Sequence, residues 1–316
     1  MIRLDHRGRV PDALRGAIIA LGNFDGFHLG HQAVVAEAVE WARREGRPAI
    51  VATFDPHPVR HFAPQVPPFR LTTLDQRQEL FAAAGADAML VFHFDDALAD
   101  MSAEDFVRGL LGDHLGAAGV VTGEDFTFGK ARGGNLELLR AVGAEAGIAA
   151  RAVGPVMDAP AGKGGRPVSS SRIRDALKAG DCAEAARLMT RPFAIRGEVI
   201  HGDKRGRAIG YPTANIELGP YLRPRFGIYA VTGRLADGTV LTGAANIGVR
   251  PMFDPPKELL EPYFFDFSGD LYGQEIEVAL RNFLRPEATF ASLDALKAQM
   301  AEDCEQARNI LSAAPQ

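Results

Sequence analysis

Two histidines and three glycines lie within the ten residues 22–31, GNFDGFHLGH. The glycines allow tight backbone turns, and His28 and His31, three residues apart, share one side of the helix predicted to follow. Amide groups and the dipole at a helix start attract anions, and two imidazoles beside them can donate to phosphate oxygens. The segment is a candidate phosphate site, although a surface turn with incidental histidines also fits it when it is taken alone.

A second candidate for phosphate binding is residues 168–177, VSSSRIRDAL. The serines at 169–171 can cap a helix and offer hydroxyl and amide groups, and Arg172 or Arg174 adds a permanent positive charge. Taken alone, this pattern is more typical of a helix start with solvated arginines. Its functional interpretation therefore depends on the histidine segment upstream.

Two loops between these segments carry aromatic and acidic residues. Residues 53–62, TFDPHPVRHF, contain a rigid turn, because each proline restricts itself and the residue before it. Residues 123–135, GEDFTFGKARGGN, contain Phe126 and Phe128, which could be ordinary core residues. The alternative is a planar aromatic ligand that stacks among Phe62, Phe128 and polar backbone groups.

The longest ordered motif is residues 197–218, GEVIHGDKRGRAIGYPTANIEL. Its glycines would let backbone amides approach a polyphosphate, with Lys204 and Arg207 as cations. Thr213 and Asn215, two residues apart after a proline, can point the same way as oxygen ligands for Mg²⁺. A glycine-rich hairpin that binds no ligand is the alternative interpretation of this segment.

The elements that position these motifs change character along the chain. Up to about residue 185, short apolar runs alternate with amphipathic stretches, which predicts a parallel sheet covered by helices. The expected strands are 16–24, 48–54, 88–92, 118–123 and 147–153, and the expected helices include 30–45, 73–84 and 102–111. Ligands of such sheets bind beyond the carboxyl ends of the strands, where the first three motifs fall.

From Phe193 onward, the segments are short, rich in β-branched and aromatic residues, and separated by glycines, which predicts a small antiparallel barrel. The expected strands are 193–200, 227–235, 239–248, 262–267 and 276–284. Residues 236–240, ADGTV, predict a hairpin turn. A final helix is expected over 292–311, with Ser292 as its N-cap.

Length and composition are those of a globular protein with two domains. The chain has 316 residues, of which 47% are hydrophobic and 24% charged, and no apolar run approaches the ~18 residues of a membrane span. A net charge of −5 argues against binding nucleic acid through a general positive field. Cys182 and Cys304 show no metal-site spacing, so we expect packing roles for both. We expect the protein to be cytoplasmic, with no membrane partner.

The motifs together carry a resemblance to known families. The segments GNFDGFHLGH and SSSRIR resemble the two signatures of the HxGH nucleotidyltransferase superfamily, and residues 197–218 resemble the flavokinase motif. Over nearly its whole length, the chain resembles the prokaryotic bifunctional riboflavin kinase/FAD synthetase family. The resemblance implies a Rossmann-like FMN adenylyltransferase domain at 1–185 and a Greek-key β-barrel riboflavin kinase domain at 186–316. The implied substrates are ATP, riboflavin and FMN, with Mg²⁺ as cofactor.

The resemblance also implies roles for individual residues. Glu261, five residues before the aspartate of the DF pair, corresponds to the catalytic base of the kinase, and His28, His31 and Arg172 to the catalytic residues of the adenylyltransferase. The implied ATP-binding residues of the adenylyltransferase are Gly22, Asn23, Phe24, Asp25, Gly26, His28, His31, Ser170, Ser171 and Arg172. Its implied flavin-binding residues are Asp55, Pro56, His57, Pro58, Phe62, Asp125 and Phe128. The implied nucleotide-binding residues of the kinase are Gly202, Lys204, Gly206, Arg207, Gly210, Pro212, Thr213 and Asn215, with Thr213 and Asn215 as metal ligands.

Three positions depart from the family pattern. Tyr263 stands where many relatives carry histidine, Met252 replaces a common threonine, and Asp125 replaces an asparagine of some relatives. The first two bear on the positioning of flavin or metal in the kinase, so an enzyme with one working activity is an alternative. A flavin- or nucleotide-binding regulator without catalysis is another, but simple binding does not require a proton acceptor such as Glu261. The oligomeric state is left open.

Overall fold

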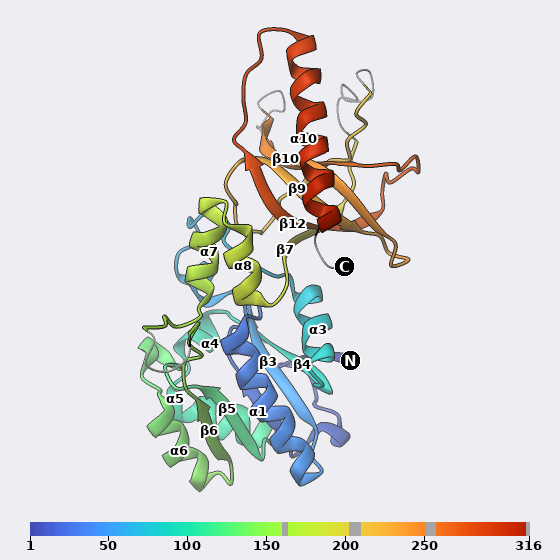
Figure 1. The fold of residues 1–316 in the computed structure, drawn as a ribbon. Coiled ribbons are helices and arrows are strands. Elements are labelled where there is room, and N and C mark those ends of the chain that lie inside the picture. The colour runs from blue at the N-terminus through green and yellow to red at the C-terminus, as the bar shows by residue number, and fades with distance from the viewer. Residues whose placement is uncertain (160–163, 202–209, 251–256, 314–316) are drawn as a thin grey trace. The chain divides into compact units, whose positions relative to one another are not determined.

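A computed structural model describes residues 1–159, 164–201, 210–250 and 257–313. The chain forms two compact units, which are treated separately below (Figure 1). The first comprises Met1–Pro67 and Thr73–Ser169, and the second Pro68–Thr72 and Ser170–Gln316. Among the helices of the described residues, none is long and apolar enough to span a membrane.

The first unit is built on a six-stranded parallel sheet in the order β1-β4-β3-β2-β5-β6. Its strands are β1 (Ile2–Asp5), β2 (Ile18–Leu21), β3 (Ala49–Asp55), β4 (Ala88–His93), β5 (Gly119–Gly123) and β6 (Ala149–Val153). The chain winds from β2 to β3 and β4 on one side and then crosses to β5 on the other side of β2. The order therefore reverses between β2 and β5, which is where such sheets bind ligands.

Helices connect these strands and cover the sheet. They are α1 (Leu29–Glu45), α2 (Pro58–Phe62), α3 (Leu74–Ala83), α4 (Asp96–Asp100), α5 (Ala103–Asp105) and α6 (Leu136–Glu145), with 3-10 turns at Asp12–Leu14 and Lys130–Arg132. Two of these helices have well-defined ends. Helix α1 ends at Gly46, which has φ 63°, and Thr73 and Gln76 form a capping box at the start of α3.

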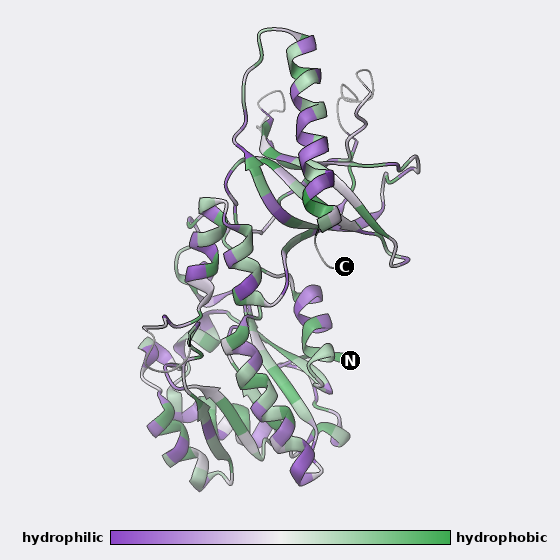
Figure 2. Cartoon of the chain, viewed as in Figure 1, coloured by the Kyte–Doolittle hydropathy of each residue, from purple (hydrophilic) through white to green (hydrophobic). Residues whose placement is uncertain are grey.

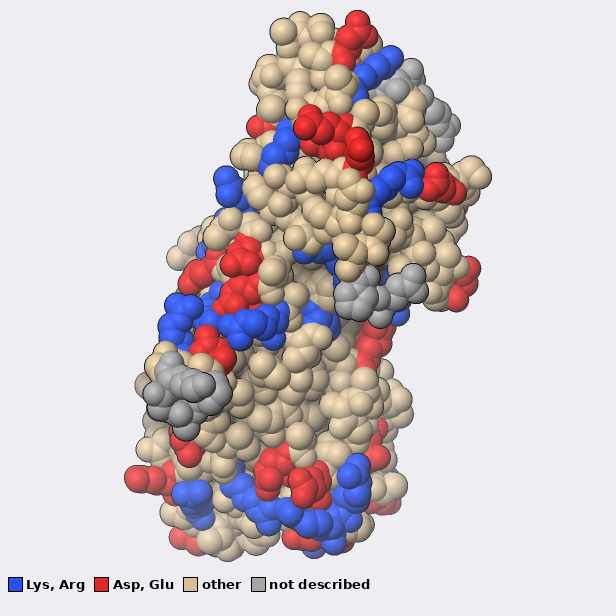
Figure 3. Space-filling view, in the orientation of Figure 1, with Lys and Arg blue, Asp and Glu red and all other residues tan. Residues whose placement is uncertain are grey.

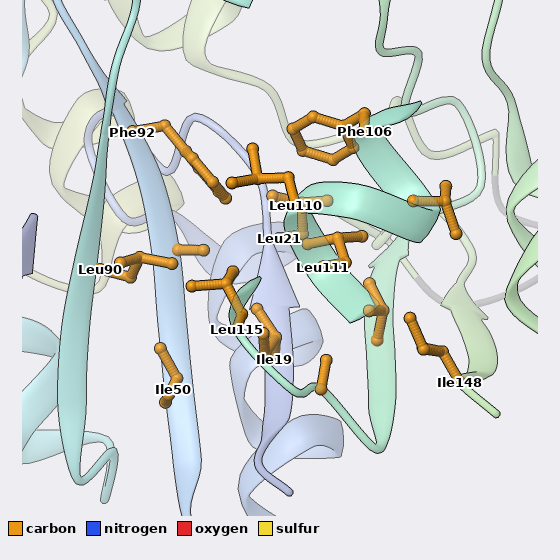
Figure 4. Close-up of a cluster of buried hydrophobic side chains, with 14 of the residues drawn as sticks. Ile19, Leu21, Ile50, Leu90, Phe92, Phe106, Leu110, Leu111, Leu115 and Ile148 are labelled. Atoms are coloured by element: carbon orange, nitrogen blue, oxygen red, sulfur yellow. The ribbon is translucent and has the colours of Figure 1, made fainter. Parts of the chain in front are cut away.

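Alternate residues of the central strands supply two apolar cores. Ile19 and Leu21 of β2 pack with Leu90, Phe106 and other side chains on one face, as Figure 4 shows. Their neighbours along β2 belong to a second cluster with α1 and Phe81 on the other face. Figure 2 shows the corresponding pattern, with hydrophobic residues along β3 and mixed residues along α1. Because both faces are covered, the carboxyl ends of the strands are left for the polar motifs.

The second unit begins with helices α7 (Ser170–Ala179) and α8 (Cys182–Met189) and continues into an antiparallel sheet of order β7-β12-β9-β10-β11-β8. The strands are β7 (Phe193–Glu198), β8 (Ile216–Glu217), β9 (Gly227–Arg234), β10 (Val240–Arg250), β11 (Lys257–Phe264) and β12 (Glu275–Arg285). An isolated bridge between Ile200 and Asn215 draws the two edges together, so the sheet is a nearly closed barrel. Helix α10 (Leu293–Ala313) packs on it through Ala307, and Ser292 caps this helix as expected.

Some elements differ from the sequence expectation. Strand β11 covers Lys257–Phe264 instead of 262–267, because the chain turns at Asp266, which has φ 56°. The predicted helix at 102–111 begins with a Ser102 cap but widens into a π-helix at Phe106–His114. Strands β1 and β8 were not expected. The first is a short, largely exposed edge strand of sequence IRLD, and the second has only two residues.

Candidate active sites

The first candidate site is the loop of residues 22–28 between β2 and α1, here called the histidine loop. It leaves the sheet at the point where the strand order reverses, and α1 begins directly after it. Asn23 Oδ1 is buried and has no hydrogen-bond partner among the described residues. Val168 lies beside the start of α1, because its carbonyl oxygen is 3.7 Å from the position a Cβ would take at Gly30. The chain enters the serine motif immediately after Val168.

His28 caps helix α1. Its Nδ1 accepts hydrogen bonds from the amides of Gly30, at 3.1 Å, and His31, at 3.4 Å. An Nδ1 that accepts places the ring proton on Nε2, which becomes the donor of this imidazole. The rings of His28 and His31 stack with centroids 3.6 Å apart. The amides of Gly30 and His31 are therefore already bonded to His28, and anion binding at this helix start stays a prediction.

Two of the predicted flavin-binding segments follow β3 and β5, the strands on either side of β2. After β3, His57 caps α2 through its Nδ1, and Phe62 at the end of that helix is 69% exposed. The Phe62 ring lies 5.7 Å from Phe94 and 5.1 Å from His61. After β5, Asp125 is exposed. An exposed aromatic ring at the carboxyl ends of the strands is suited to stacking on a planar ligand.

Phe128 has a different position from Phe62. It is 6% exposed and packs in the core against Phe106, with ring centroids 5.4 Å apart. A Cβ at Gly134 would stand 2.7 Å from the Phe128 ring, which shows how closely the loop folds over it. The structure thus favours the core role that the sequence left open for Phe128, and its contact with flavin stays a prediction.

From Ser170 onward, the serine and arginine motif belongs to the second unit. Helix α7 begins at Ser170. Arg172 forms an ion pair with Glu184 of α8, and Arg187 also donates to Glu184, at 2.8 Å. Hydrogen bonds from Arg187 and then Arg172 lower the pKa of the Glu184 carboxyl. Arg172 is therefore held in an ion pair, and its part in the adenylyltransferase site stays a prediction.

The second candidate site is a pocket of about 440 Å³ in the barrel unit. Its polar wall includes Glu261 and Thr213, and its apolar wall includes Phe290, Leu296 and Met300. This size is within the range of about 300–1,000 Å³ that is usual for small-molecule sites. The pocket thus combines the predicted base, one predicted metal ligand and a surface for an aromatic ligand.

Glu261 is anchored by neighbours from other elements. It lies on β11 opposite Asn246 of β10, and Asn246 Nδ2 donates to Glu261 Oε2 at 3.4 Å. Arg250, at the end of β10, forms an ion pair with Glu261 and contacts Glu287 at 3.4 Å. The Glu261 side chain is only 16% exposed. A carboxylate so enclosed needs such partners to stay charged.

The predicted metal ligands are neutral oxygens next to this carboxylate. The Ala214 amide donates to the Pro262 carbonyl at 3.0 Å, which fixes the segment of Thr213 and Asn215 against β11. Asn215 is buried, and Thr213 lines the pocket. Among the described residues, no group of three His, Cys, Asp or Glu could hold a metal ion. The donor set fits Mg²⁺, which takes few protein ligands and completes its shell with phosphate oxygens and water.

The remaining predicted kinase residues divide into two sets. Gly210, with φ 91°, and Pro212 are described, and Tyr211 between them packs against Tyr263 with centroids 5.2 Å apart. Tyr263 lines the pocket, so this departure from the family adds an aromatic ring to its wall. The positions that lie outside the described residues are Gly202, Lys204, Gly206, Arg207 and Met252.

Cys304 also lines the pocket, which the sequence did not suggest. Burial and the neighbouring Asp303 carboxylate raise the pKa of the Cys304 thiol to about 11. Burial raises the pKa of Cys182 to about 12. Both side chains are therefore thiols at neutral pH, which is typical of packing residues.

Comparisons with known proteins agree for both units. A family model described as FAD synthetase matches residues 10–172, and one described as riboflavin kinase matches residues 189–311. The bifunctional riboflavin kinase/FMN adenylyltransferase of Escherichia coli (strain K12) is 40% identical over 288 residues, covering 91% of this chain and 90% of that protein. The protein of the same name from Pseudomonas fluorescens is 40% identical over 296 residues, covering 93% of each.

A solved structure described as a macrolide-efflux protein from Streptococcus pneumoniae is 30% identical, with a TM-score of 0.85. The match covers 98% of this chain and 99% of the solved chain. The matches define a two-domain transferase, with an FAD synthetase domain followed by a riboflavin kinase domain. The chain belongs to the bifunctional riboflavin kinase/FMN adenylyltransferase family.

The contact between Arg250 and Glu261 gives a first prediction. Replacing Arg250→Met should lower the turnover of riboflavin phosphorylation by about 10- to 100-fold, because the carboxylate loses the cation that orients it. FAD formation from supplied FMN, measured on the same sample, should be unchanged. Arg223→Met, which removes a similar pair with Glu258, is the matched control. Equal kinase turnover in the two variants would contradict the role of Arg250.

Proposed function

We propose that the C-terminal domain phosphorylates riboflavin to FMN with ATP, and that the N-terminal domain adenylylates FMN with a second ATP to give FAD and pyrophosphate. The family supports both reactions. The observation that carries the residue-level proposal is the enclosed Glu261 carboxylate, which shares a pocket wall with Thr213. The proposed division of labour is 1–185 and 186–316. The family models leave residues 173–188 between them unassigned.

In the kinase, Glu261 would accept the proton of the ribityl 5′-hydroxyl as that oxygen attacks the γ-phosphate of ATP. Thr213 and Asn215 would hold Mg²⁺, which neutralises phosphate charge when it is bound. The flavin ring would lie against the apolar wall near Met300 and Tyr263. The pocket remains open with Tyr263 in its wall, so this departure is compatible with substrate binding.

In the adenylyltransferase, the FMN phosphate would attack the α-phosphate of ATP without a covalent enzyme intermediate. Such an in-line displacement requires mainly positioning and charge neutralisation. His28 would donate through Nε2, and His31, stacked on it, would assist at a neighbouring oxygen. Arg172 would supply a permanent charge, and Phe62 would stack on the flavin ring. Because both reactions consume ATP, we also propose a cytoplasmic location.

Glu261→Gln tests the kinase assignment. It keeps the size of the side chain but removes the proton acceptor, so FMN formation should fall by about 10²- to 10⁴-fold. FAD formation from supplied FMN should persist. Riboflavin, FMN and FAD are separated chromatographically over a time course, with Glu258→Gln on the same strand as control. Equal loss of both activities in Glu261→Gln would refute the division of labour.

His28→Ala/His31→Ala tests the adenylyltransferase assignment with the opposite expectation. The double variant should make FMN at the parental rate but lose at least about 10²-fold in FAD formation, because the donors to the phosphates are gone. His114→Ala serves as control, since His114 precedes β5 and so lies at the amino ends of the parallel strands, whereas the histidine loop follows the carboxyl end of β2. FAD formation at the parental rate in the double variant would show that this loop is not the adenylyl-transfer site.

A further inference from the structure

The histidine loop contains two bulky residues in a left-handed backbone conformation. Phe24 has φ 50° and Phe27 has φ 42°, and both side chains are buried. Residues other than glycine are strained in this region, and such strain persists only where the surrounding structure enforces it. The enforcing residues therefore determine where the loop presents its imidazoles.

Helix α3 supplies two side chains that contact the loop, Arg77 and Phe81, here called the α3 clamp. They are one helical turn apart and share a face of the helix. Phe81 is fully buried and meets both loop phenylalanines edge to face, at 5.8 Å from Phe24 and 5.2 Å from Phe27. The strained part of the loop thus packs on a single aromatic ring.

Arg77 fixes the beginning of the same loop. It is 2% exposed, and its Nη1 donates to the Asn23 carbonyl at 3.2 Å and to the Thr53 hydroxyl at 2.8 Å. The Thr53 hydroxyl donates in turn to the Asn23 carbonyl at 2.8 Å. Bonds from a charged donor are stronger than those between neutral groups. The Asn23 carbonyl therefore accepts hydrogen bonds from one residue of β3 and one residue of α3.

Direct contacts lead from the α3 clamp to the imidazoles. The Phe24 ring meets the His31 ring edge to face at 5.4 Å, and His31 stacks on His28. Phe24 thus lies between Phe81 and His31. A shift of the loop at Asn23 or Phe24 would move the imidazoles by a similar distance. The two clamp residues themselves are too buried to reach a substrate.

We propose that Arg77 is a positioning residue of the adenylyltransferase, which acts by fixing the histidine loop through the Asn23 carbonyl. The proposal rests on the proposed role of this loop in adenylyl transfer. Because Thr53 also donates to Asn23, loss of Arg77 leaves the loop attached but less constrained. The expected effect is on turnover and not on substrate affinity, since a 1 Å misplacement of reacting groups costs about 10²-fold in rate.

The test uses the full chain with Arg77→Met, which removes the guanidinium and leaves an unbranched apolar side chain of similar volume. The kcat of FAD formation should fall by about 10- to 100-fold, with the KM values for FMN and ATP within about twofold of the parent. Arg77→Lys, which restores one charged donor, should recover part of the loss. The matched control is Gln78→Met, a surface residue of the same helix.

Further measurements separate positioning from misfolding. Kinase activity on the same sample reports on the second domain, and the thermal unfolding midpoint of each variant shows whether assays were made on folded protein. Should Arg77→Met not fold, Phe81→Leu tests the clamp from its other residue with the same expected loss of kcat. A parental kcat in Arg77→Met, or a loss confined to KM, overturns the proposal. If the His28→Ala/His31→Ala variant also retains its rate, the proposed function fails instead.

Discussion

The turn from β2 into α1 is the constraint on which the chemistry proposed for the first unit depends. The chain leaves the sheet after Leu21 and begins a helix at Leu29, with strands on both sides of β2. Within this span, Phe24 and Phe27 adopt positive φ angles, at a cost of about 1–3 kcal/mol each. The cost is offset because both rings are buried against Phe81. Strain and burial together leave the loop few alternative positions.

In the barrel unit, the proposed base is held by a different means. There the constraint is electrostatic, because Glu261 is enclosed in a pocket wall and would be costly to keep charged alone. Arg250 and Asn246 supply the compensating charge and hydrogen bond, while Glu287 holds both of these in turn. Removing any one member leaves another unsatisfied, so the four side chains act as one unit.

Much of this organisation could be predicted from the sequence, for identifiable reasons. Short apolar runs that alternate with amphipathic stretches predicted β2 to β6, and the central strands β2 and β3 show the continuous hydrophobic sequence of strands buried on both faces. The charged edge strand β1 lacks that signal, and β11 was misplaced because the turn at Asp266 is set by backbone conformation. His28 and Thr213 stood out because their types and spacing suit phosphate and metal binding, whereas Glu261 was identified only through the resemblance to the flavokinase family, and the roles of all three stay predictions.

The supporting residues could not be found in the same way. Asn246 meets Glu261 through strand register, and Arg77 reaches Asn23 across 54 positions of the chain. Both residues stand in ordinary strand and helix patterns, where a polar side chain has no distinguishing spacing. Phe128 illustrates a different limit. A phenylalanine at this position is compatible with a core role and with ligand stacking, and the sequence does not distinguish them. Its packing against Phe106 favours the core role. Partners of a functional residue become visible only once elements far apart in sequence are paired.

Two ion pairs of the second unit bear on a difficulty that the composition creates. A chain with net charge −5 repels polyphosphates at long range, and Figure 3 shows both signs of charge interspersed on the face in view. Cations must then be placed locally and kept oriented without substrate. Arg172 on Glu184 and Arg250 on Glu261 are both partly buried pairs of this kind. Glu184 orients Arg172, whose guanidinium would also bind a phosphate. Arg250 orients Glu261, whose carboxylate would accept a proton. The roles proposed for the two pairs are thus opposite, although the interaction is the same.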